Sequence, residues 1–282
     1  MVRADGGDRS RVGGIRPVRC RPVTRAEPIR VGVLGAAGRM GATACLAVEG
    51  DPGLELVAAV DPHRPGGEVA GLTIAGDISA LEEAGAEVAV DFTVLDAARA
   101  NLAWCADHGV HAVVGTTGFT EDDHAALHVA FTRSNCLIAP NFAIGAVLMM
   151  RFAELAAPFF ETAEIIELHH DAKADAPSGT AMMTARRMAA ASGDWAPDPT
   201  TREVVGGARG GTGPAGIHVH SVRLRGLVAH QEVLLGTVGQ SLTIRHDSYS
   251  RESFMPGVLL AIKRVADHPG VTVGLDAYLG LG

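Results

Sequence analysis

The chain has 282 residues, which suits one large domain or two modest ones. Hydrophobic residues make up 47% of it and charged residues 20%, so there is enough apolar material for a core and a disordered polypeptide is excluded. The 35 glycines follow no period, which excludes collagen-like and low-complexity proteins. No stretch approaches the roughly 20 apolar residues that span a membrane, so we expect no membrane partner.

The charge is unevenly distributed along the chain. Residues 1–30 hold eight Arg against three acidic residues, a balance of +5, so the formal net charge of −8 leaves −13 for residues 31–282. A body this acidic repels phosphate backbones, so we expect no nucleic-acid partner. Residues 1–28 are rich in Arg, Gly and Pro and lack apolar periodicity, which predicts a disordered N-terminal extension. An Arg-rich leader can also be a targeting segment, but its Gly and Pro residues disfavour that interpretation.

The cysteines show no metal-binding or redox spacing. Cys20, Cys45, Cys105 and Cys136 are never spaced as CxxC, and three of them lie in apolar segments. This usage predicts a cytoplasmic protein without structural zinc. Lysine is also rare: 22 of the 24 basic residues are Arg, which makes Lys173, in a stretch crowded with ionisable residues, a candidate functional group.

Short β-rich segments alternate with helical ones in the first half of the chain. We expect strands at 29–34, 54–60, 88–92, 110–114 and 136–138. The first strand is followed by a glycine-rich turn at 35–41 and a helix that ends at about 49, and further helices are expected at about 94–107 and 121–132. Strand–helix alternation with short turns predicts an α/β fold with a Rossmann-type doubly wound parallel sheet.

The pattern changes after residue 140. A helix is expected at about 144–157, a strand at 163–169, a helix from 179, and β-rich segments at 217–224, 227–235 and 241–245. Consecutive strands with short turns predict an inserted α+β domain with an open mixed sheet. A helix at 251–266 and a strand at 271–275 then return to the first domain. The predicted domains are therefore 29–140 with 250–282 for the dinucleotide, and 141–249 for the second domain.

A glycine-rich turn follows the first predicted strand. Gly35 permits a sharp turn, Gly38 lets the backbone approach a pyrophosphate, and Gly41 permits close helix packing. The helix that begins here would offer its free N–H groups to phosphates. Because the spacing is GxxGxxG instead of GxGxxG, a tight turn without a ligand stays an alternative.

Asp61 ends the second predicted strand. An acidic residue at that point would accept hydrogen bonds from the adenosine ribose of NAD, although it could also be a plain turn aspartate before Pro62. His63 and Arg64 could meet the 2′-phosphate of NADP, so both cofactors stay open. Two further turns, Gly115-Thr116-Thr117-Gly118 and Ala139-Pro140-Asn141-Phe142, follow strands of the same sheet and should line the same crevice.

The sharpest signal is the stretch 167–180, ELHHDAKADAPSGT. It places His169, His170 and Lys173 at the end of a strand, and Ser178 then opens a helix whose N-terminus attracts anions. A histidine can carry a proton near neutral pH, so the stretch predicts a carboxylate site with a proton donor beside it. A zinc site is disfavoured because adjacent strand residues point to opposite faces and no third ligand is suitably spaced. A purely structural polar loop capped by Ser178 is the remaining alternative.

These motifs together resemble the 4-hydroxy-tetrahydrodipicolinate reductase (dihydrodipicolinate reductase) family. The similar segments are VGVLGAAGRMG (31–41), DFT (91–93), GTTG (115–118), APNFAIG (139–145) and ELHHDAKADAPSGTA (167–181). The resemblance covers residues 29–282, and its last segment is highly specific.

The resemblance implies a role for each matching residue. His169 would be the proton donor and Lys173 its catalytic partner, whereas His170, Gly179 and Thr180 would hold the substrate carboxylates. The residues implied for the cofactor are Gly35, Ala36, Ala37, Gly38, Arg39 and Met40 at the pyrophosphate, Asp61 at the ribose, and Gly115, Thr116, Thr117, Ala139, Pro140, Asn141 and Phe142 at the nicotinamide half.

The resemblance also implies an activity and an assembly. The family reduces a cyclic imine-type dicarboxylate with NADH or NADPH to tetrahydrodipicolinate, in the diaminopimelate route to lysine. It assembles as a homotetramer through the sheet of the second domain, and its domains close on a hinge. Because the substrate is a dianion and the body is acidic, the cluster around Lys173 must reverse the local field.

Two other functions are weighed against this one. A semialdehyde or homoserine dehydrogenase would share the two-domain fold, but a semialdehyde dehydrogenase needs a nucleophilic cysteine, and Cys136, the one candidate, lies inside a predicted strand. A non-catalytic NAD(P) sensor is disfavoured because both His169 and Lys173 are present and no basic DNA-binding segment is visible.

Overall fold

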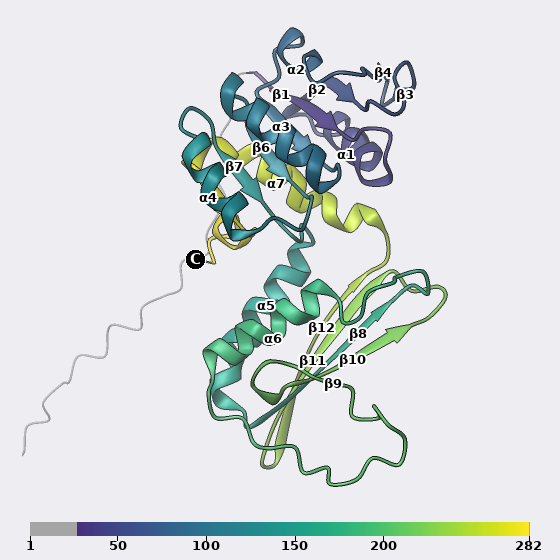
Figure 1. The fold of residues 1–282 in the computed structure, drawn as a ribbon, viewed down its shortest axis with the longest axis vertical. Helices are drawn as coiled ribbons and strands as arrows, with labels where there is room; N and C mark the ends of the chain where they lie inside the picture. The colour runs from purple at the N-terminus through teal and green to yellow at the C-terminus, as the bar shows by residue number, and fades with distance from the viewer. Residues whose placement is uncertain (1–26, 282) are drawn as a thin grey trace, which may run out of the picture.

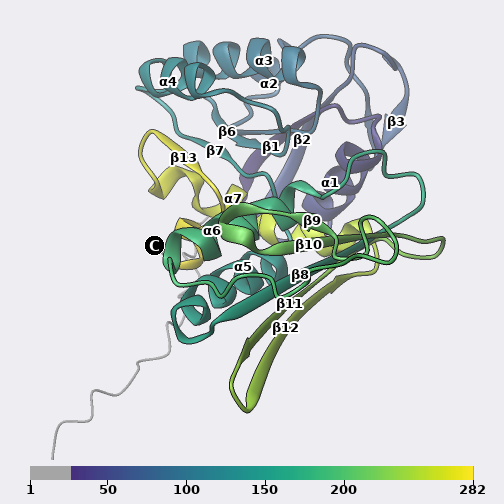
Figure 2. The same ribbon diagram turned by 60° about the horizontal axis from the view of Figure 1, so that its bottom comes forward.

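The computed structural model describes residues 27–281 and shows two lobes, each built on its own sheet (Figures 1 and 2). The disorder predicted for residues 1–28 concerns a segment that lies, up to residue 26, outside the described residues. The upper lobe in Figure 1 holds a six-stranded sheet in which every neighbouring pair is parallel. In sheet order its strands are β13 (Val271–Val273), β7 (Cys136–Ile138), β6 (His111–Val114), β5 (Val88–Asp91), β1 (Ile29–Leu34) and β2 (Leu54–Val60). The predicted parallel, doubly wound sheet is confirmed.

Both faces of this parallel sheet are buried, as its apolar strands require. Val31 and Val33 of β1 point to one face and share an apolar cluster with residues of α1 and α7. Leu34 points to the opposite face, where it shares a cluster with residues of α3 and α4. The covering helices are α1 (Arg39–Glu49), α7 (Met255–Arg264), α3 (Leu95–His108) and α4 (Glu121–Ala130). Alternate residues of one strand therefore enter two separate cores.

The order of the strands locates a ligand crevice. β1 lies between β2 and β5. The chain passes from β1 to β2 on one side, and the later strands β5, β6 and β7 are added on the other side, so the strand order reverses at β1. In open α/β sheets, ligands bind beyond the carboxyl end of a strand at such a reversal. The glycine-rich turn that begins at Gly35 directly follows β1 and therefore lies at this crevice.

The lower lobe holds a five-stranded mixed sheet. β8 and β10 are parallel neighbours, and the remaining pairs are antiparallel. In sheet order the strands are β12 (Gln240–Ser248), β11 (Ala229–Thr237), β8 (Thr162–His169), β10 (His218–Arg223) and β9 (Gly211–Thr212). The predicted open mixed sheet is thus confirmed.

The two faces of the mixed sheet differ in cover. Ile165, Val233 and Leu235 are buried beneath α5 (Ile144–Ala156) and α6 (Gly179–Ala191), which pack on one face (Figures 1 and 2). The residues between them, such as Ile166 and Leu234, point to the other face and are half-buried. Within residues 27–281 no helix covers that second face.

Sequence reasoning missed or misjudged only short elements. The segment 251–266, predicted as one helix, is divided into a 3₁₀ turn at Arg251–Phe254, α7, and a second 3₁₀ turn at Val265–Asp267. Pro256 explains the break, because proline fits the first turn of a new helix but not a helix interior. The helix and strands missed are α2 (Ala80–Glu83), β3 (Glu68–Val69), β4 (Leu72–Thr73) and β9, which are too short to show a period.

The first helical turn of α7 lies against the turn at 139–142. A Cβ atom on Gly257 would stand 2.0 Å from the carbonyl oxygen of Phe142, so the two backbones touch. Replacing Gly257 by Ala should therefore shift one of them and lower the free energy of unfolding by about 1–3 kcal/mol. A Cβ atom on Gly193 would meet nothing within 4 Å, so Gly193→Ala is the control. Thermal unfolding checks this, and equal midpoints for the two variants would contradict it.

Candidate functional site

The glycine-rich turn leaves the N-terminus of α1 open. The backbone N–H groups of Gly35 and Ala36 donate to the carbonyl of Val60, at 2.9 and 3.1 Å, which ties the turn to β2. A Cβ atom on Gly41 would lie 2.0 Å from the carbonyl oxygen of Gly35, so only glycine permits this packing. No side chain caps α1 at Gly38, and its first turn holds no acidic residue. The first N–H groups of the helix are therefore available to an anion.

Asp61 lies at the end of β2 and against the glycine-rich turn. It is 7% exposed, and its carboxylate accepts hydrogen bonds from the backbone N–H groups of Ala37 at 3.1 Å and His63 at 3.0 Å. Each carboxylate oxygen has a second lone pair with which to accept a hydroxyl. The structure thus brings Asp61 and the turn together, with His63 and Arg64 exposed beside them.

The turn at 115–118 is organised by a buried aspartate that sequence reasoning missed. Asp91, at the end of β5, accepts hydrogen bonds from the hydroxyls of Thr93 at 2.7 Å and Thr116 at 3.1 Å, and from the Asn101 amide at 2.8 Å. The side chain of Thr116 is therefore directed back to Asp91 and is buried. Thr117 stays exposed, so it is the hydroxyl of this turn that a ligand can reach.

The turn at 139–142 joins the two lobes. The side-chain oxygen of Asn141 accepts from the N–H of Ala143 at 2.8 Å, and its amide donates to the hydroxyl of Thr180 at 3.2 Å. Asn141 was predicted at the cofactor and Thr180 at the substrate. One hydrogen bond therefore brings the two predicted sites into contact. Phe142 is buried and packs edge-on against Phe92, with ring centroids 6.1 Å apart.

His169 is the last residue of β8 and is partly buried. Its Nδ1 atom lies 2.5 Å from a carboxylate oxygen of Glu167, which is fully buried. Burial lowers the pKa of His169, and the charges of Lys173 and Arg223 act in the same direction against the opposing effect of Glu167. The His170 side chain is exposed, so the two histidines have different surroundings.

Lys173 is held by its own loop. Its ammonium group lies 2.7 and 2.9 Å from the two carboxylate oxygens of Asp175, which is 65% exposed at the side chain. The hydrogen bond from Lys173 lowers the pKa of Asp175. Lys173 therefore contributes positive charge near His169, but no hydrogen bond joins the two side chains.

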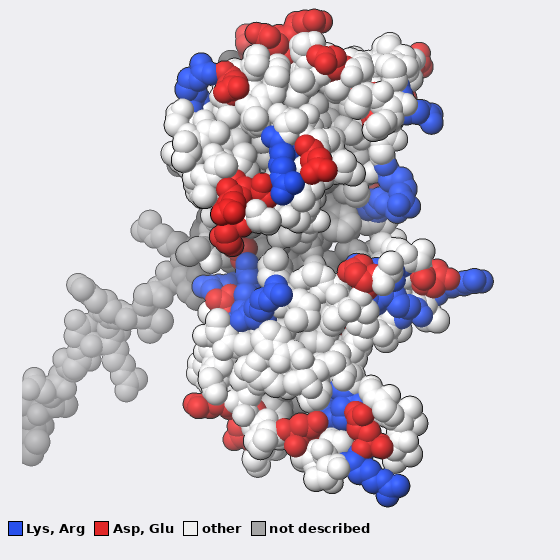
Figure 3. Space-filling view, viewed as in Figure 1, with Lys and Arg blue, Asp and Glu red and all other residues white. Residues whose placement is uncertain are grey.

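The N-terminus of α6 completes the predicted carboxylate site. Ser178 caps the helix by accepting from the N–H of Ala181 at 3.2 Å. Gly179 is exposed, and a Cβ atom there would meet nothing within 4 Å. The first turn of α6 thus presents N–H groups to the space in front of it. In Figures 1 and 2 the loop after β8 lies on the same side of the molecule as α1, and Figure 3 shows a hollow between the lobes with basic and acidic side chains mixed along both rims.

A small cavity brings several predicted residues together. Asn141, His169, Ser178 and Thr180 all line it, although Lys173, His170 and the glycine-rich turn do not. Sequence reasoning missed the remaining lining residues, because they lie on separate strands and helices and form no contiguous motif. They include the titratable residues His230, whose Nδ1 lies 2.7 Å from Asp247, and His246, whose pKa is lowered by burial.

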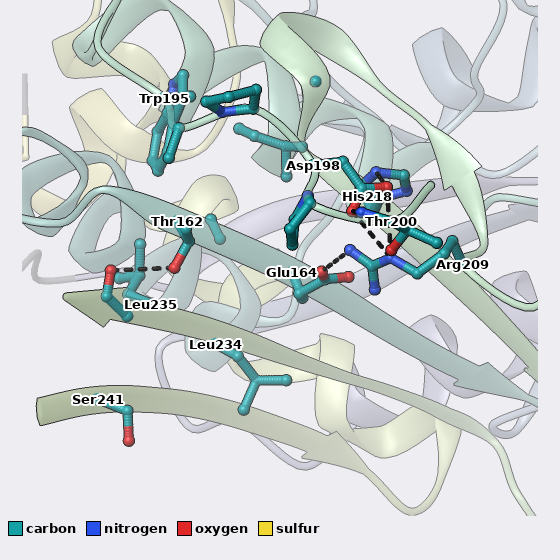
Figure 4. Close-up of a pocket in the computed structure, with 17 residues that line it drawn as sticks. Thr162, Glu164, Trp195, Asp198, Thr200, Arg209, His218, Leu234, Leu235 and Ser241 are labelled. Atoms are coloured by element: carbon teal, nitrogen blue, oxygen red, sulfur yellow. Dashed lines mark hydrogen bonds and ion pairs between the residues drawn. The ribbon is translucent and has the colours of Figure 1, made fainter. Parts of the chain in front are cut away.

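A larger cavity of about 500 Å³ lies at the other end of the mixed sheet (Figure 4). Arg209 donates to Glu164 there at 2.6 Å, and His218 lies 3.2 Å from Asp198. Glu164 is five residues from His169 along β8, or about 17 Å. None of the predicted site residues lines this cavity.

Neither the described cysteines nor the other described metal-ligand residues form a second site. Cys45, Cys105 and Cys136 are free and buried, and burial raises the pKa of Cys136 well above that of an ordinary thiol. Among residues 27–281, no three His, Cys, Asp or Glu side chains are grouped to hold a metal ion. Over the same range no helix has the length and apolar character needed to cross a membrane.

Comparisons with known proteins point in one direction. The family model described as "Dihydrodipicolinate reductase, N-terminus" matches residues 29–142, and "Dihydrodipicolinate reductase, C-terminus" matches residues 145–279. The 4-hydroxy-tetrahydrodipicolinate reductase of Mycobacterium marinum is 54% identical over 257 residues, 90% of this chain and 100% of the relative. That of Corynebacterium urealyticum is 50% identical over 260 residues, 90% and 99% of the two chains. A dipicolinate-bound dihydrodipicolinate reductase from Paenisporosarcina sp. TG-14 has a TM-score of 0.79 at 39% identity, covering 89% of this chain and 99% of that one.

The burial of Cys136 predicts that its thiol does not react in the folded protein. A buried thiol with a raised pKa holds little thiolate at pH 8, and a reagent cannot reach it. Brief treatment with iodoacetamide followed by peptide mass spectrometry should find Cys136 labelled only after denaturation. Rapid labelling of the native protein would contradict this and would restore the thiol-dependent dehydrogenase as an alternative.

Proposed function

Since the chain belongs to the dihydrodipicolinate reductase family, we propose roles for its own residues in the family's reaction. Its activity is the reduction of 4-hydroxy-tetrahydrodipicolinate to tetrahydrodipicolinate, a step of the diaminopimelate route to lysine. In our proposal His169 is the proton donor and Lys173 its partner. The observation that carries the proposal is the hydrogen bond from Asn141 to Thr180, at the edge of the cavity that also holds His169.

The open turn at 35–41 fits a dinucleotide. Gly35–Gly38 form the turn that lets a pyrophosphate approach, and the first residues of α1, Arg39 and Met40, offer it their backbone N–H groups. Asp61 offers its carboxylate to the ribose hydroxyls. The turns at Gly115–Thr117 and Ala139–Phe142 support the nicotinamide half. When bound, the reduced nicotinamide supplies the hydride. NADPH is accommodated as well as NADH, because His63 and Arg64 are exposed beside Asp61; steady-state kinetics with each cofactor measures the preference.

The substrate side of the crevice must attract a dianion to an acidic protein. The N-terminus of α6 at Gly179 and Thr180 receives one carboxylate through backbone N–H groups, and His170 and Lys173 add positive or proton-donating groups. In the structure Lys173 pairs with Asp175. Exposed ion pairs of this kind contribute only about 0–1 kcal/mol, so a substrate carboxylate competes well for the ammonium group.

His169 gains a proton when the substrate arrives. Burial lowers its pKa, which favours the neutral ring. A dianion placed beside the ring favours the imidazolium and raises that pKa. Because Nδ1 is engaged by Glu167, Nε2 is the nitrogen that faces the substrate and delivers the proton to the carbanion-like carbon.

We also propose that the chain forms a homotetramer through the uncovered face of the mixed sheet. Ile166 and Leu234 are half-buried on that face, and Val238 in the turn between β11 and β12 is exposed. Apolar side chains gathered on one open face favour self-association. Residues 141–249 would then bind substrate and hold the subunits together, whereas 29–140 and 250–282 would bind the dinucleotide. Sedimentation velocity measures the mass: a mass of four chains supports the proposal and a mass of one chain contradicts it.

The predicted cytoplasmic location stays a prediction.

Replacing Lys173 by Ala should lower turnover a hundredfold or more, about 3 kcal/mol in the activation barrier, because the variant lacks the cation that stabilises developing negative charge. The other lysine supplies the control: Lys263 pairs with Asp51 at 2.5 Å, away from the site, and Lys263→Ala should leave turnover unchanged. Nicotinamide absorbance at saturating substrate reports both rates. Unchanged turnover with a raised KM for Lys173→Ala would restrict this residue to binding.

Replacing His169 by Ala should lower turnover by about 10²–10⁴, the usual loss when a general acid is removed. His108, which stacks on Trp104 in α3 of the other lobe, provides a matched substitution that should have no effect. The pH dependence of turnover is measured for both variants. Near-normal activity of His169→Ala across the pH range would mean that the proton comes from another group.

A further inference from the structure

Glu167 is a fully buried carboxylate on β8, two residues before the proposed proton donor His169 and on the same face of the strand. Its side chain points beneath α6, opposite Ser221 of β10 and Gln231 of β11. One carboxylate oxygen accepts from His169 Nδ1 at 2.5 Å, and the other accepts from the backbone N–H of Ser178 at 3.2 Å. The same carboxylate therefore contacts both the proposed proton donor and the N-cap residue of the helix proposed to bind the substrate.

Arg223 is the counter-ion of Glu167. Its two terminal nitrogens donate to the two carboxylate oxygens at 2.9 Å each, a bidentate pair. One of these nitrogens also donates to the carbonyl oxygen of Asp175 at 2.6 Å, and Asp175 holds Lys173. Arg223 thus connects the carboxylate to the loop that carries the second proposed catalytic residue.

We propose that Glu167 is a positioning residue of the reductase: with Arg223 it fixes the ring of His169 and the loop of Lys173 in one geometry, and its charge favours the protonated ring. This inference rests on the proposed role of His169. A carboxylate on Nδ1 keeps the proton on that nitrogen and directs Nε2 to the substrate. Glu167 contacts His169 and the start of α6 directly, and it reaches the loop of Lys173 through Arg223. No other described residue makes all three of these connections.

The role requires that Glu167 is ionised, and its surroundings favour the carboxylate form. Burial alone would raise the pKa of Glu167, but hydrogen bonds from Arg223, Ser221 and His169 outweigh that effect and hold the pKa below its usual value. Glu167 therefore stays ionised at neutral pH. Its negative charge raises the pKa of His169, whereas Arg223 lowers it. The two members of the ion pair act on His169 in opposite directions, which makes their effects separable.

The other titratable groups around His169 do not duplicate this effect. Lys173 lowers the pKa of His169 and is itself paired with Asp175. His230 and His246, from β11 and β12, line the same cavity. His230 is bonded to Asp247, and burial lowers the pKa of His246 and favours its neutral form. Glu167 is the one carboxylate that contacts the ring among residues 27–281.

The same strand contains a matched control. Glu164, three residues before Glu167, also pairs with a histidine and an arginine. It lies 2.6 Å from His220 and 2.6 Å from Arg209, and Figure 4 shows the pair with Arg209. Glu164 and Arg209 line the larger cavity, where no proposed catalytic residue is found. A Glu-to-Gln change at 164 therefore alters the same chemistry without touching the reaction.

The test is the pH dependence of turnover in three variants of the full chain. In the wild type, turnover falls as pH rises through the pKa of His169 in the substrate complex, because the acid loses its proton. Glu167→Gln should move this fall to lower pH by about one unit or more, so that activity is reduced about tenfold at high pH and recovers as pH is lowered. Arg223→Gln should move the fall to higher pH and raise the KM for the substrate. Glu164→Gln should change neither.

Each outcome decides between a positioning and a purely structural role. If Glu167→Gln lowers turnover equally at every pH, or if Arg223→Gln moves the profile in the same direction as Glu167→Gln, the inference is wrong. Should Glu167→Gln fail to fold, which circular dichroism shows, Arg223→Gln and the charge-preserving Glu167→Asp carry the test, and Glu167→Asp should retain most of the wild-type profile. Loss of activity in His169→Ala with no shift in the Glu167 variant would reject this inference alone, whereas normal activity in His169→Ala would reject the proposed function itself.

Discussion

A single buried carboxylate, Glu167, holds the reacting end of the mixed sheet together. An ionised group removed from water costs several kcal/mol unless its lone pairs are filled. Here they are filled by the ring of His169, the guanidinium of Arg223 and the N–H of Ser178. Because the burial is tolerated only when these donors are in place, the carboxylate selects one arrangement of a histidine, a loop and a helix start. The fold of β8 and β10 therefore determines the chemistry at their carboxyl ends.

The two lobes share the reaction between them. In our proposal the parallel sheet supplies the open end of α1 for the dinucleotide, and the mixed sheet supplies the imidazole and the cations for the dianion. Side chains link the lobes where Asn141 bonds to Thr180, and where Arg187 of α6 forms a bidentate pair with Asp276 at 2.7 and 2.9 Å. One apolar cluster also contains residues of both lobes. In our proposal Lys173 exchanges its exposed partner Asp175 for a substrate carboxylate.

The parts of the fold that were predictable are those with a repeating or local signal. The alternation of strands and helices predicted both sheets, and the glycines at 35–41 and the stretch 167–180 predicted the two halves of the candidate site. Glu167 was visible in that stretch, but its partner Arg223 lies 56 residues further along the chain, so the pair could not be recognised. The same holds for Asp91 beneath Thr116, which depends on the packing of parallel strands, and for His230 and His246 in the cavity.

Electrostatic detail was the least predictable part of the site. The sequence indicated a histidine that titrates near neutral pH, but burial and two neighbouring cations lower the pKa of His169 in the free protein. It also indicated a positive charge at Lys173, but not that its ammonium group is paired with Asp175, two residues away. Both effects depend on exact burial and distance, which no pattern of residue types encodes.

The most direct measurement is a crystal structure of this chain with NADH and dipicolinate, the ligand bound in the Paenisporosarcina sp. TG-14 structure. We expect one carboxylate of dipicolinate at the N–H groups of Gly179 and Thr180, and the ammonium of Lys173 released from Asp175 to lie about 3 Å from a carboxylate oxygen. His169 should face the ring through Nε2 while Nδ1 stays bonded to Glu167. Dipicolinate bound in the cavity of Figure 4, or His169 turned away from Glu167 to reach the ligand through Nδ1, would contradict the mechanism.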